Sequence, residues 1–394
     1  MGEWKEYVLE DVIEKFIDYR GKTPKKTTIG VPLVTAKIVK AGRILEPNEF
    51  IAESDYDLWM TRGLPEIDDV VLTTEAPLGE VALIKNKKIA LAQRIITLRG
   101  KKTYAHNPFL KYYFQSGTGQ YELESRASGT TVFGIKAAVL RKMPIILPSL
   151  PEQKSIASVL SSLDDKIDLL HRQNKTLEAM AETLFRQWFV EKAQEDWEKK
   201  TLADYAVHIK VSVKPASNPM KIYTHYSLPA FDNGMRPVNE IGSEILSNKY
   251  SVKPWTILVS KLNPRFPRIW AIGNTPGENA ICSTEFQVFK PTNMKLYGYL
   301  YYLLKSNDAR EELAMAASGT SGSHQRVRPE DILNIKSSTP SITLAEQYSE
   351  LMMPGINKLM ANLEQIHSLE KLRDTLLPKL MSGEVRMDYT EDAA

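Results

Sequence analysis

The chain has 394 residues and a net charge of +3, and 43% of its residues are hydrophobic and 25% charged. This composition is typical of globular proteins and excludes disordered, collagen-like and disulfide-rich chains. The single cysteine, Cys282, cannot form an internal disulfide, and we interpret it as a buried or incidental thiol. No apolar run reaches the ~18 residues of a membrane span and the start does not resemble a signal peptide, so we expect a cytoplasmic location.

The two halves of the chain repeat the same features in the same order. Trp4 has a counterpart in Trp197, and the tetrapeptide Ala-Ser-Gly-Thr occurs at 127–130 and again at 317–320. The dipeptide Glu-Gln at 152–153 returns at 346–347. Because these offsets all lie between 190 and 194, the sequence predicts a tandem duplication.

Each repeat begins with short apolar runs separated by turn residues, which indicates a mixed α/β domain. In the first repeat, residues 68–86 predict two strands joined through Pro77 and Gly79, residues 90–100 a further strand, and residues 107–116 a helix. In the second repeat, strands are predicted at 255–262 and 280–290 and the equivalent helix at 296–306.

Each repeat ends in a long predicted helix. In the first, apolar or permissive residues follow a strict 4-3 spacing that is typical of a coiled coil, and Asn174 on this seam is expected to fix the register. The seam residues are Ile156, Leu160, Leu163, Ile167, Leu170, Asn174, Leu177, Ala181, Leu184 and Trp188. The second seam is broader and consists of Leu359, Leu363, Ile366, Leu369, Leu372, Leu376 and Leu380. Pro354-Gly355 has no counterpart in the first helix and predicts a bend or a late helix start.

We expect the two helices to pair antiparallel and to separate two α/β domains. The predicted boundaries are 1–150 for the first α/β domain, 151–195 for the first helix, 196–338 for the second α/β domain, 339–386 for the second helix and 387–394 for a tail. Charge alternates along the chain, with net values of +4 for 1–150, −2 for 151–195, +4 for 196–335 and −3 for 336–394. The positive charge therefore belongs to the α/β domains.

The sequence lacks the common catalytic motifs. It contains no phosphate-binding loop, zinc-protease motif, paired Cys-X-X-Cys or nucleophile elbow, and its six histidines are scattered singly. The segments 107–109 and 263–266 superficially resemble the target-base motif of amino-methyltransferases, but both lack its second proline, so we interpret them as turns. We predict a chain that is not an enzyme, with no catalytic residue and no metal site.

Basic residues occur in stretches without acids in both α/β domains, at 20–43, 81–121 and 245–277. A single lysine is more often merely solvated, but such blocks in both domains favour nucleic acid, since phosphates attract them and Arg, Lys and Gln can read base edges. The two Ser-Gly-Thr loops are either flexible turns or phosphate contacts. The candidate DNA-binding residues are Lys22, Lys25, Lys26, Gln93, Arg94 and Thr130 in the first domain and Lys261, Arg265, Arg268, Thr320, Gln325 and Arg326 in the second.

The tract at 147–189 closely resembles the central conserved region of specificity (S) subunits of type I restriction–modification systems. The motifs DYRGKTP at 18–24 and ASGTTVFGIKAAVLRKMPIILP at 127–148 are similar to the first target-recognition domain of that family. The second half repeats this plan with ASGTSGSHQRV, so the resemblance covers essentially the whole chain.

The resemblance implies a non-catalytic subunit that recognises DNA. Each domain would read one half of a bipartite asymmetric site on double-stranded DNA, and the helices would set the spacer and dock two methyltransferase (M) subunits, which nuclease-translocase (R) subunits join. S-adenosylmethionine, ATP and Mg²⁺ would belong to those partners, with no cofactor in this chain and no membrane contact. The helix residues assigned to the coiled coil and to docking are Ile156, Leu160, Leu163, Ile167, Leu170, Asn174, Leu177, Leu184, Leu359, Ile366, Leu369 and Leu376.

Three other interpretations remain open at this stage. A fused methyltransferase-specificity enzyme is disfavoured by the missing methyl-donor and target-base motifs. A non-specific coiled-coil adaptor leaves the two basic domains unexplained. A specificity subunit that serves modification alone is compatible with every feature of the sequence.

Overall fold

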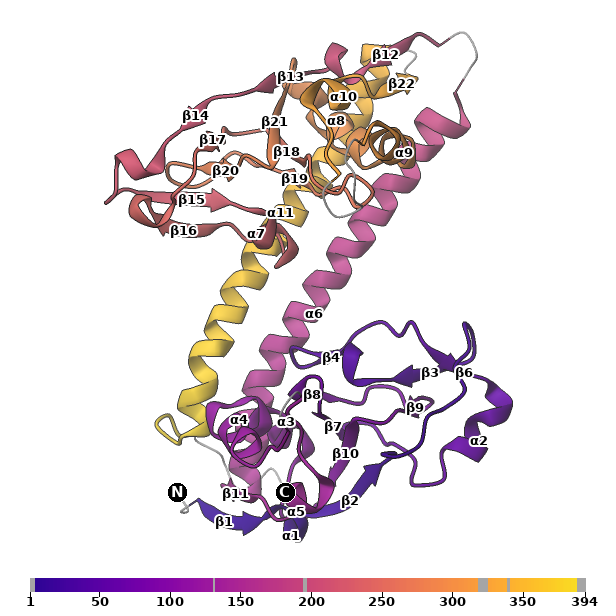
Figure 1. Cartoon of the computed structure of the whole chain (residues 1–394), viewed down its shortest axis with the longest axis vertical. Coiled ribbons are helices and arrows are strands. Elements are labelled where there is room, and N and C mark those ends of the chain that lie inside the picture. The colour runs from indigo at the N-terminus through magenta and orange to yellow at the C-terminus, as the bar shows by residue number, and fades with distance from the viewer. Residues whose placement is uncertain (1–3, 130–131, 194–196, 318–324, 339–340, 388–394) are drawn as a thin grey trace. The chain divides into compact units, whose positions relative to one another are not determined.

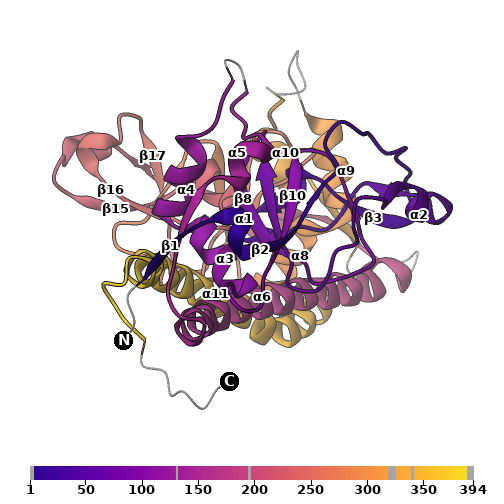
Figure 2. The same ribbon diagram turned by 90° about the horizontal axis from the view of Figure 1, so that it is seen from below.

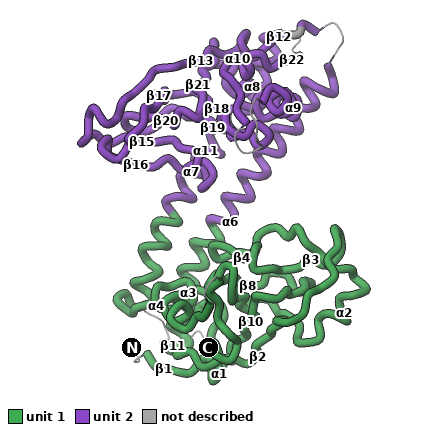
Figure 3. Tube along the Cα trace, viewed as in Figure 1, with its two compact units in different colours: residues 1–166, 369–394 green, residues 167–368 purple. Residues whose placement is uncertain are grey.

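The structure is a computed structural model that describes residues 4–129, 132–193, 197–317, 325–338 and 341–387. The chain folds into two compact units, unit 1 with residues 1–166 and 369–394 and unit 2 with residues 167–368 (Figure 3). Each unit contains one α/β domain and a segment of both long helices, α6 (Leu150–Arg186) and α11 (Ile342–Met381) (Figure 1). Among the described helices, none combines the length and the apolar character that crossing a membrane requires.

The α/β domain of unit 1 is built on a four-stranded antiparallel sheet in the order β2-β10-β7-β8. Alternate residues of its central strand β7 (Val70–Thr74) face two different cores: Val70 and Leu72 pack toward α3 and α6, whereas Val71 packs toward β3 and β9. Because both faces are covered, every residue of β7 is buried, including Thr73 and Thr74 at its end. The other strands are β1 (Lys5–Val8), β2 (Ile13–Asp18), β3 (Val31–Val34), β4 (Val39–Lys40), β5 (Arg43–Ile44), β6 (Phe50–Ile51), β8 (Leu78–Leu83), β9 (Ala90–Leu91), β10 (Ile95–Gly100) and β11 (Pro144–Leu147). The helices are α1 (Leu9–Val12), α2 (Tyr56–Trp59), α3 (Asn107–Gln115), α4 (Gly117–Glu124) and α5 (Ala137–Arg141).

The α/β domain of unit 2 repeats this plan, with a four-stranded sheet in the order β13-β21-β18-β19. The pair β1-β11 of unit 1 likewise has a counterpart in β12-β22, so the duplication predicted from the sequence is confirmed in the topology. A further five-stranded sheet has the order β14-β17-β20-β15-β16. The strands are β12 (Lys199–Thr201), β13 (Ala206–Ile209), β14 (Ser212–Val213), β15 (Ile222–Tyr226), β16 (Val238–Ile241), β17 (Lys249–Ser251), β18 (Ile257–Ser260), β19 (Ile269–Ala271), β20 (Ile281–Ser283), β21 (Phe286–Pro291) and β22 (Lys336–Ser338). The helices are α7 (Leu228–Asp232), α8 (Tyr297–Lys305), α9 (Asn307–Ala316) and α10 (Pro329–Leu333).

The elements expected from the sequence are present at or near the expected residues. Residues 68–86 form β7 and β8, residues 107–116 form α3, and residues 296–306 form α8. The run at 90–100 forms two strands, β9 and β10, because Arg94 between them has a φ of 71° and interrupts the extended backbone.

The long helices run antiparallel within each unit. In unit 1, Asp164 of α6 meets Arg373 of α11, and nearer the start of α6 Glu152 meets Arg386, just beyond α11. Figure 2 shows α3 lying between the sheet of unit 1 and α6. In unit 2, Asn174 and Ala181 of α6 meet Asn362 and Tyr348 of α11. Every seam position predicted in the first helix is buried or half-buried, and a π-helical turn, Gln187–Glu191, continues α6.

The expected late start of the helix at Pro354-Gly355 is wrong, because α11 begins at Ile342 and runs to Met381. Pro354 lies on the exposed face of the helix, where water can solvate the carbonyl of Glu350, which has no amide hydrogen at residue 354 to bond. Gly355 faces Leu177, whose Cδ2 would lie 3.9 Å from a Cβ at residue 355.

The second seam also differs from the prediction at two positions. Leu372 is exposed, and the seam is occupied there by the half-buried Arg373. Similarly, the fully buried Asn362 lies on the seam beside the half-buried Leu363. Both errors follow from reading apolar residues alone, since polar side chains that find partners can occupy a helix seam.

Candidate nucleic-acid interface

In unit 1, three segments meet where strand β7 ends. The backbone amide of Thr74 donates a 2.9 Å hydrogen bond to the carbonyl of Arg94, and the amide of Ile135 donates a 2.9 Å bond to the carbonyl of Thr74. Glu75 forms an isolated antiparallel bridge with Gly134. We refer to this junction as edge 1, formed by residues 74–76, 93–94 and 132–136.

In unit 2, the same junction is built with the same backbone hydrogen bonds. The amide of Lys261 donates a 2.9 Å bond to the carbonyl of Glu285, and the amide of Val327 donates a 3.0 Å bond to the carbonyl of Lys261. Leu262 forms an isolated antiparallel bridge with Arg326. We refer to this junction as edge 2, formed by residues 261–266, 285 and 325–328.

The strand at each edge is followed by the same left-handed turn before a proline. Ala76 has a φ of 48° before Pro77, and Asn263 has a φ of 53° before Pro264. Asparagine tolerates this region better than most residues. The interpretation of 263–266 as a turn is therefore confirmed. It is wrong for 107–109, which forms the first turn of α3, where the Asn107 side chain accepts a 2.8 Å hydrogen bond from the amide of Gly100.

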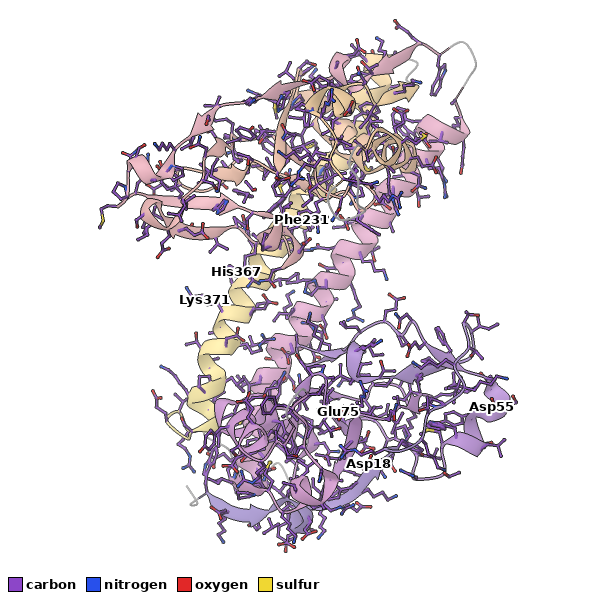
Figure 4. The ribbon with its side chains drawn as sticks, viewed as in Figure 1. Asp18, Asp55, Glu75, Phe231, His367 and Lys371 are labelled. Atoms are coloured by element: carbon purple, nitrogen blue, oxygen red, sulfur yellow. The ribbon has the colours of Figure 1, made fainter. Side chains whose placement is uncertain are left out.

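Edge 1 brings three arginines together. Nε of Arg94 lies 3.0 Å from Oε1 of Glu75, and both side chains are partly exposed. Arg20 donates through Nη2 to the carbonyl of Ile135 at 2.9 Å, and Arg62 donates through Nη1 to the carbonyl of Arg20 at 2.8 Å. Glu75 is marked in Figure 4 together with Asp18, whose Oδ1 accepts a bond from the amide of Arg20. Gln93, from the candidate set, lies half-buried beside Arg94.

Edge 2 contains four of the predicted DNA-binding residues, Lys261, Arg265, Gln325 and Arg326. Glu285 lies between two cations, with its carboxylate 3.9 Å from Nζ of Lys261 and 3.2 Å from Nε of Arg326. The carbonyl of Gln325 accepts a 3.0 Å hydrogen bond from the amide of Asn263. The edge thus carries a net positive charge on side chains that reach solvent.

Of the remaining candidates, Arg265 belongs to edge 2 and the others lie elsewhere. Lys22, Lys25 and Lys26 are exposed on the segment between β2 and β3, where Lys26 pairs with Glu49 at 2.8 Å. Arg265 is exposed on the turn of edge 2. Arg268 is held by a bidentate contact with Asp232 at 2.7 and 2.9 Å, and this bond raises the pKa of its guanidinium. Thr130 and Thr320 lie outside the described residues.

The predicted docking residues of the helices are buried or half-buried in the helix pair and in the domain cores. Their burial agrees with the coiled-coil role that was predicted for them. Exposed apolar side chains on the same helices are Leu169, Met180, Ile342, Leu351 and Leu372. These residues, rather than the seam, are available to another protein.

Burial shifts the pKa values of several titratable groups in the two domains. Burial raises the pKa of the Cys282 thiol to about 12, so this side chain stays protonated, as expected for a buried thiol. Burial also lowers the pKa values of His106, His208 and His225. Within the described residues, no group of three or more His, Cys, Asp or Glu side chains is arranged to hold a metal ion.

Comparison with known proteins relates these features to a family. Residues 1–179 match the family model of the type I restriction modification DNA specificity domain. The chain is 26% identical over 346 residues to the type I restriction enzyme MjaIX specificity subunit of Methanocaldococcus jannaschii, which covers 81% of this chain and 78% of that one. The chain is thus similar to type I restriction specificity subunits over most of its length.

Further proteins show the same similarity. The MjaVIII specificity subunit of the same organism is 24% identical over 356 residues, which is 82% of this chain and 80% of that one. The crystal structure of a type I restriction–modification S subunit from M. genitalium superposes with a TM-score of 0.58 at 17% sequence identity. That match covers 98% of this chain and 97% of the other, so the two proteins share their fold over nearly their whole lengths.

Sequence reasoning missed several residues of the two edges. Arg62 stands outside the acid-free stretches, and its place at edge 1 depends on bonds to the backbone of residues distant in sequence. Glu75 and Glu285 were missed because a search for cations does not select carboxylates. The aligned repeats contain a usable signal, since Thr74 and Lys261 occupy equivalent positions before a left-handed residue and a proline.

Proposed function

We propose that this chain is the non-catalytic DNA-recognition subunit of a type I restriction–modification complex, and that edge 1 and edge 2 each read one half of a bipartite site. The observation that carries this proposal is the duplication of one backbone junction with different side chains on it. Two edges of the same shape with different functional groups suit two half-sites of different sequence. The similarity to specificity subunits supports the same conclusion.

The side chains of the edges are suited to the major groove of DNA. A guanidinium such as that of Arg94 or Arg326 can donate two hydrogen bonds to guanine. A side-chain amide such as that of Gln93 or Gln325 can donate one hydrogen bond to adenine and accept another from it. The exposed lysines Lys22 and Lys25 would contact phosphates, which position the protein without reading sequence.

Glu75 and Glu285 add selectivity in this proposal. In the free protein each carboxylate pairs with a cation of its edge. To bind the arginine of an edge, a DNA base must displace the glutamate from it. A base without hydrogen-bond acceptors in the right places cannot do so, and the arginine then stays paired with the glutamate. A phosphate backbone alone also repels the carboxylate, which weakens binding to DNA of the wrong sequence.

The partners follow from the proposed role. Two methyltransferase subunits would dock on the exposed faces of α6 and α11, nuclease-translocase subunits would join them, and the helices would set the spacer between half-sites. S-adenosylmethionine, ATP and Mg²⁺ would be bound by those subunits, and this chain would contribute no reacting group. A system that only modifies DNA would have the same specificity and methyltransferase subunits and would lack the nuclease subunits.

A methylome tests the proposal. The chain is co-expressed with its neighbouring methyltransferase in a host that lacks type I systems, and modified adenines are mapped by long-read sequencing. We expect one bipartite motif that disappears when the chain is omitted. Methylation of the same sites without the chain, or none with an assembled and active methyltransferase, would contradict the proposal and favour an adaptor role.

Variants at the edges assign the half-sites in the same assay. Arg94→Ala should relax the motif in one half and Arg326→Ala in the other, each leaving the opposite half unchanged. Lys87→Ala and Lys253→Ala remove exposed cations of the same two domains outside the edges and serve as matched controls. If either edge variant altered both halves or neither, the assignment of one edge to one half-site would be wrong.

A further inference from the structure

Each edge exposes one phenylalanine. The chain contains eleven phenylalanines, all within the described residues, and Phe133 and Phe266 are the two that are exposed, at 63% and 74%. The other nine are buried or half-buried, among them Phe109, Phe114 and Phe286, which are fully buried. Phenylalanine is therefore exposed in this protein at the two edges, whereas elsewhere it is at least half-buried.

The two rings reach equivalent edges from different segments. Phe133 directly precedes Gly134, which bridges Glu75 in edge 1. Phe266 lies in the turn after β18, and its amide donates a 2.9 Å hydrogen bond to the carbonyl of Asn263 in edge 2. The two rings are therefore carried by non-equivalent segments of the two repeats.

The surroundings of both rings are cationic. Phe133 shares edge 1 with Arg94 and with Arg20, which bonds the carbonyl of Ile135 two residues further on. Phe266 follows the exposed Arg265 and shares edge 2 with Arg326. An apolar ring surrounded by cations suits a ligand with an anionic surface and an apolar interior. The duplex of DNA has this construction, with phosphates around stacked bases.

We propose that Phe133 and Phe266 insert into the DNA at one base step in each half-site and stack on the bases that they separate. This inference rests on the proposed function of the edges. Phenylalanine wedges of this kind partly unstack a base step and bend the duplex, and the bend brings more protein surface into contact. The cations beside each ring hold the phosphates that flank the opened step.

The consequence for recognition is a preference that hydrogen bonds do not supply. Pyrimidine–purine steps unstack most easily, so each wedge favours such a step at the position where it enters. Because Phe133 and Phe266 come from different segments of their edges, the preferred step falls at different places in the two half-sites. The chain would thus read part of its site through the deformability of the DNA.

The test uses the full chain and a duplex that carries the mapped bipartite site. The fluorescent base 2-aminopurine, whose emission rises on unstacking, replaces each adenine of the site in turn, and binding is followed by anisotropy in the same titration. We expect one position of increased emission per half-site. Phe133→Ala should abolish one signal and Phe266→Ala the other, with affinity for the duplex reduced roughly 5- to 150-fold by each loss of a stacked ring.

Two kinds of control separate insertion from general effects. Phe133→Trp and Phe266→Trp keep a ring that can stack and should retain the emission increase. Leu58→Ala on α2 and Leu246→Ala before β17 remove similarly exposed apolar side chains outside the edges and should change neither signal nor affinity. Emission that stays the same in both alanine variants while the duplex remains bound would overturn the insertion and leave the proposed function standing. Failure of the wild-type chain to bind the duplex would overturn both.

Discussion

Asn362 of α11 donates a 2.8 Å hydrogen bond from Nδ2 to Oδ1 of Asn174 on α6, and both side chains are buried in unit 2. Gln173 lies beside them, with Oε1 3.4 Å from the same nitrogen of Asn362. A one-turn shift of either helix would separate the two amides and bury each without a partner. The pair therefore specifies the register of the helix pair.

Replacing one member of this pair should destabilise the protein more than replacing both. Asn174→Leu leaves the Asn362 amide buried without its acceptor, and we expect a loss of about 1–3 kcal/mol in the free energy of unfolding. The double variant Asn174→Leu/Asn362→Leu should recover most of this loss. Denaturant unfolding measures both. Thr176→Leu on the exposed face of α6 is the control, and a double variant as unstable as the single one would contradict the pairing.

Asp164 on α6 should be essential for the stability of unit 1. Its Oδ2 lies 2.6 Å from Nζ of the buried Lys111 and accepts a 2.8 Å bond from the hydroxyl of Tyr112, and its Oδ1 accepts a 3.1 Å bond from Arg373. Burial raises the pKa of Asp164, but Lys111 and these hydrogen bonds outweigh burial and hold the pKa below its usual value. Asp164→Asn removes the carboxylate that pairs with the buried Lys111.

We expect Asp164→Asn to cost about 3–5 kcal/mol of unfolding free energy, as does the loss of one partner of a buried ion pair. Chemical denaturation at pH 7 measures the cost. The adjacent Asp165→Asn removes an exposed carboxylate of the same helix and should change stability by less than about 0.5 kcal/mol. Equal effects of the two variants would show that the contacts of Asp164 contribute nothing.

Stability should fall as the pH drops below neutrality. Burial lowers the pKa of His225 below 6.5, although its Nδ1 lies 2.6 Å from Oε2 of Glu240, and burial does the same for His106 and His208. The folded chain therefore binds these protons less readily than the unfolded chain does. Their contribution is complete above about pH 6.5 and is lost progressively below it. The melting temperature, measured between pH 8 and 5, should decline in the acidic half of this range.

His225→Gln should flatten part of this decline, because glutamine keeps a polar group without taking up a proton. A wild-type profile that is flat from pH 8 to 5 would contradict the prediction. So would a His225→Gln profile identical to that of the wild type.

Removing the carboxylate of edge 2 should strengthen binding to DNA of arbitrary sequence. Glu285→Gln releases Lys261 and Arg326 from their present partner and removes a repulsion toward phosphate. We expect a several-fold higher affinity for non-cognate duplex and a salt dependence that steepens by up to about one unit of log K per log salt. Glu278→Gln removes an exposed carboxylate of unit 2 outside the edge and is the control. An unchanged or weaker affinity for non-cognate DNA would contradict the role given to Glu285.

The sequence predicted the architecture where local pattern alone decides it. The seam from Ile156 to Trp188 is visible because one side of a helix is buried continuously. The strands β7 and β18 are visible because both of their faces are covered. The seam positions of Asn362 and Arg373 could not be predicted, because each side chain is polar. Each is stabilised on the seam by a partner on α6, Asn174 for Asn362 and Asp164 for Arg373.

The candidate site was predicted in composition and less well in arrangement. Lys261, Gln325 and Arg326 meet at edge 2 as a set of basic and amide side chains would suggest. Arg268 carries the same charge but is held by Asp232, a residue of α7 that lies far away in sequence. Pairing of this kind depends on tertiary contacts, and no spacing rule in a single sequence reports it.

The junction at the end of β7 and β18 is held by backbone atoms. Arg94 in one domain and Glu285 in the other accept the same amide hydrogen bond through their carbonyl oxygens, although their side chains carry opposite charges. The hydrogen bonds that hold this junction therefore do not depend on the side chain at either position. In the proposed function, the groups that face the DNA can then differ between the two edges while the backbone that presents them stays the same.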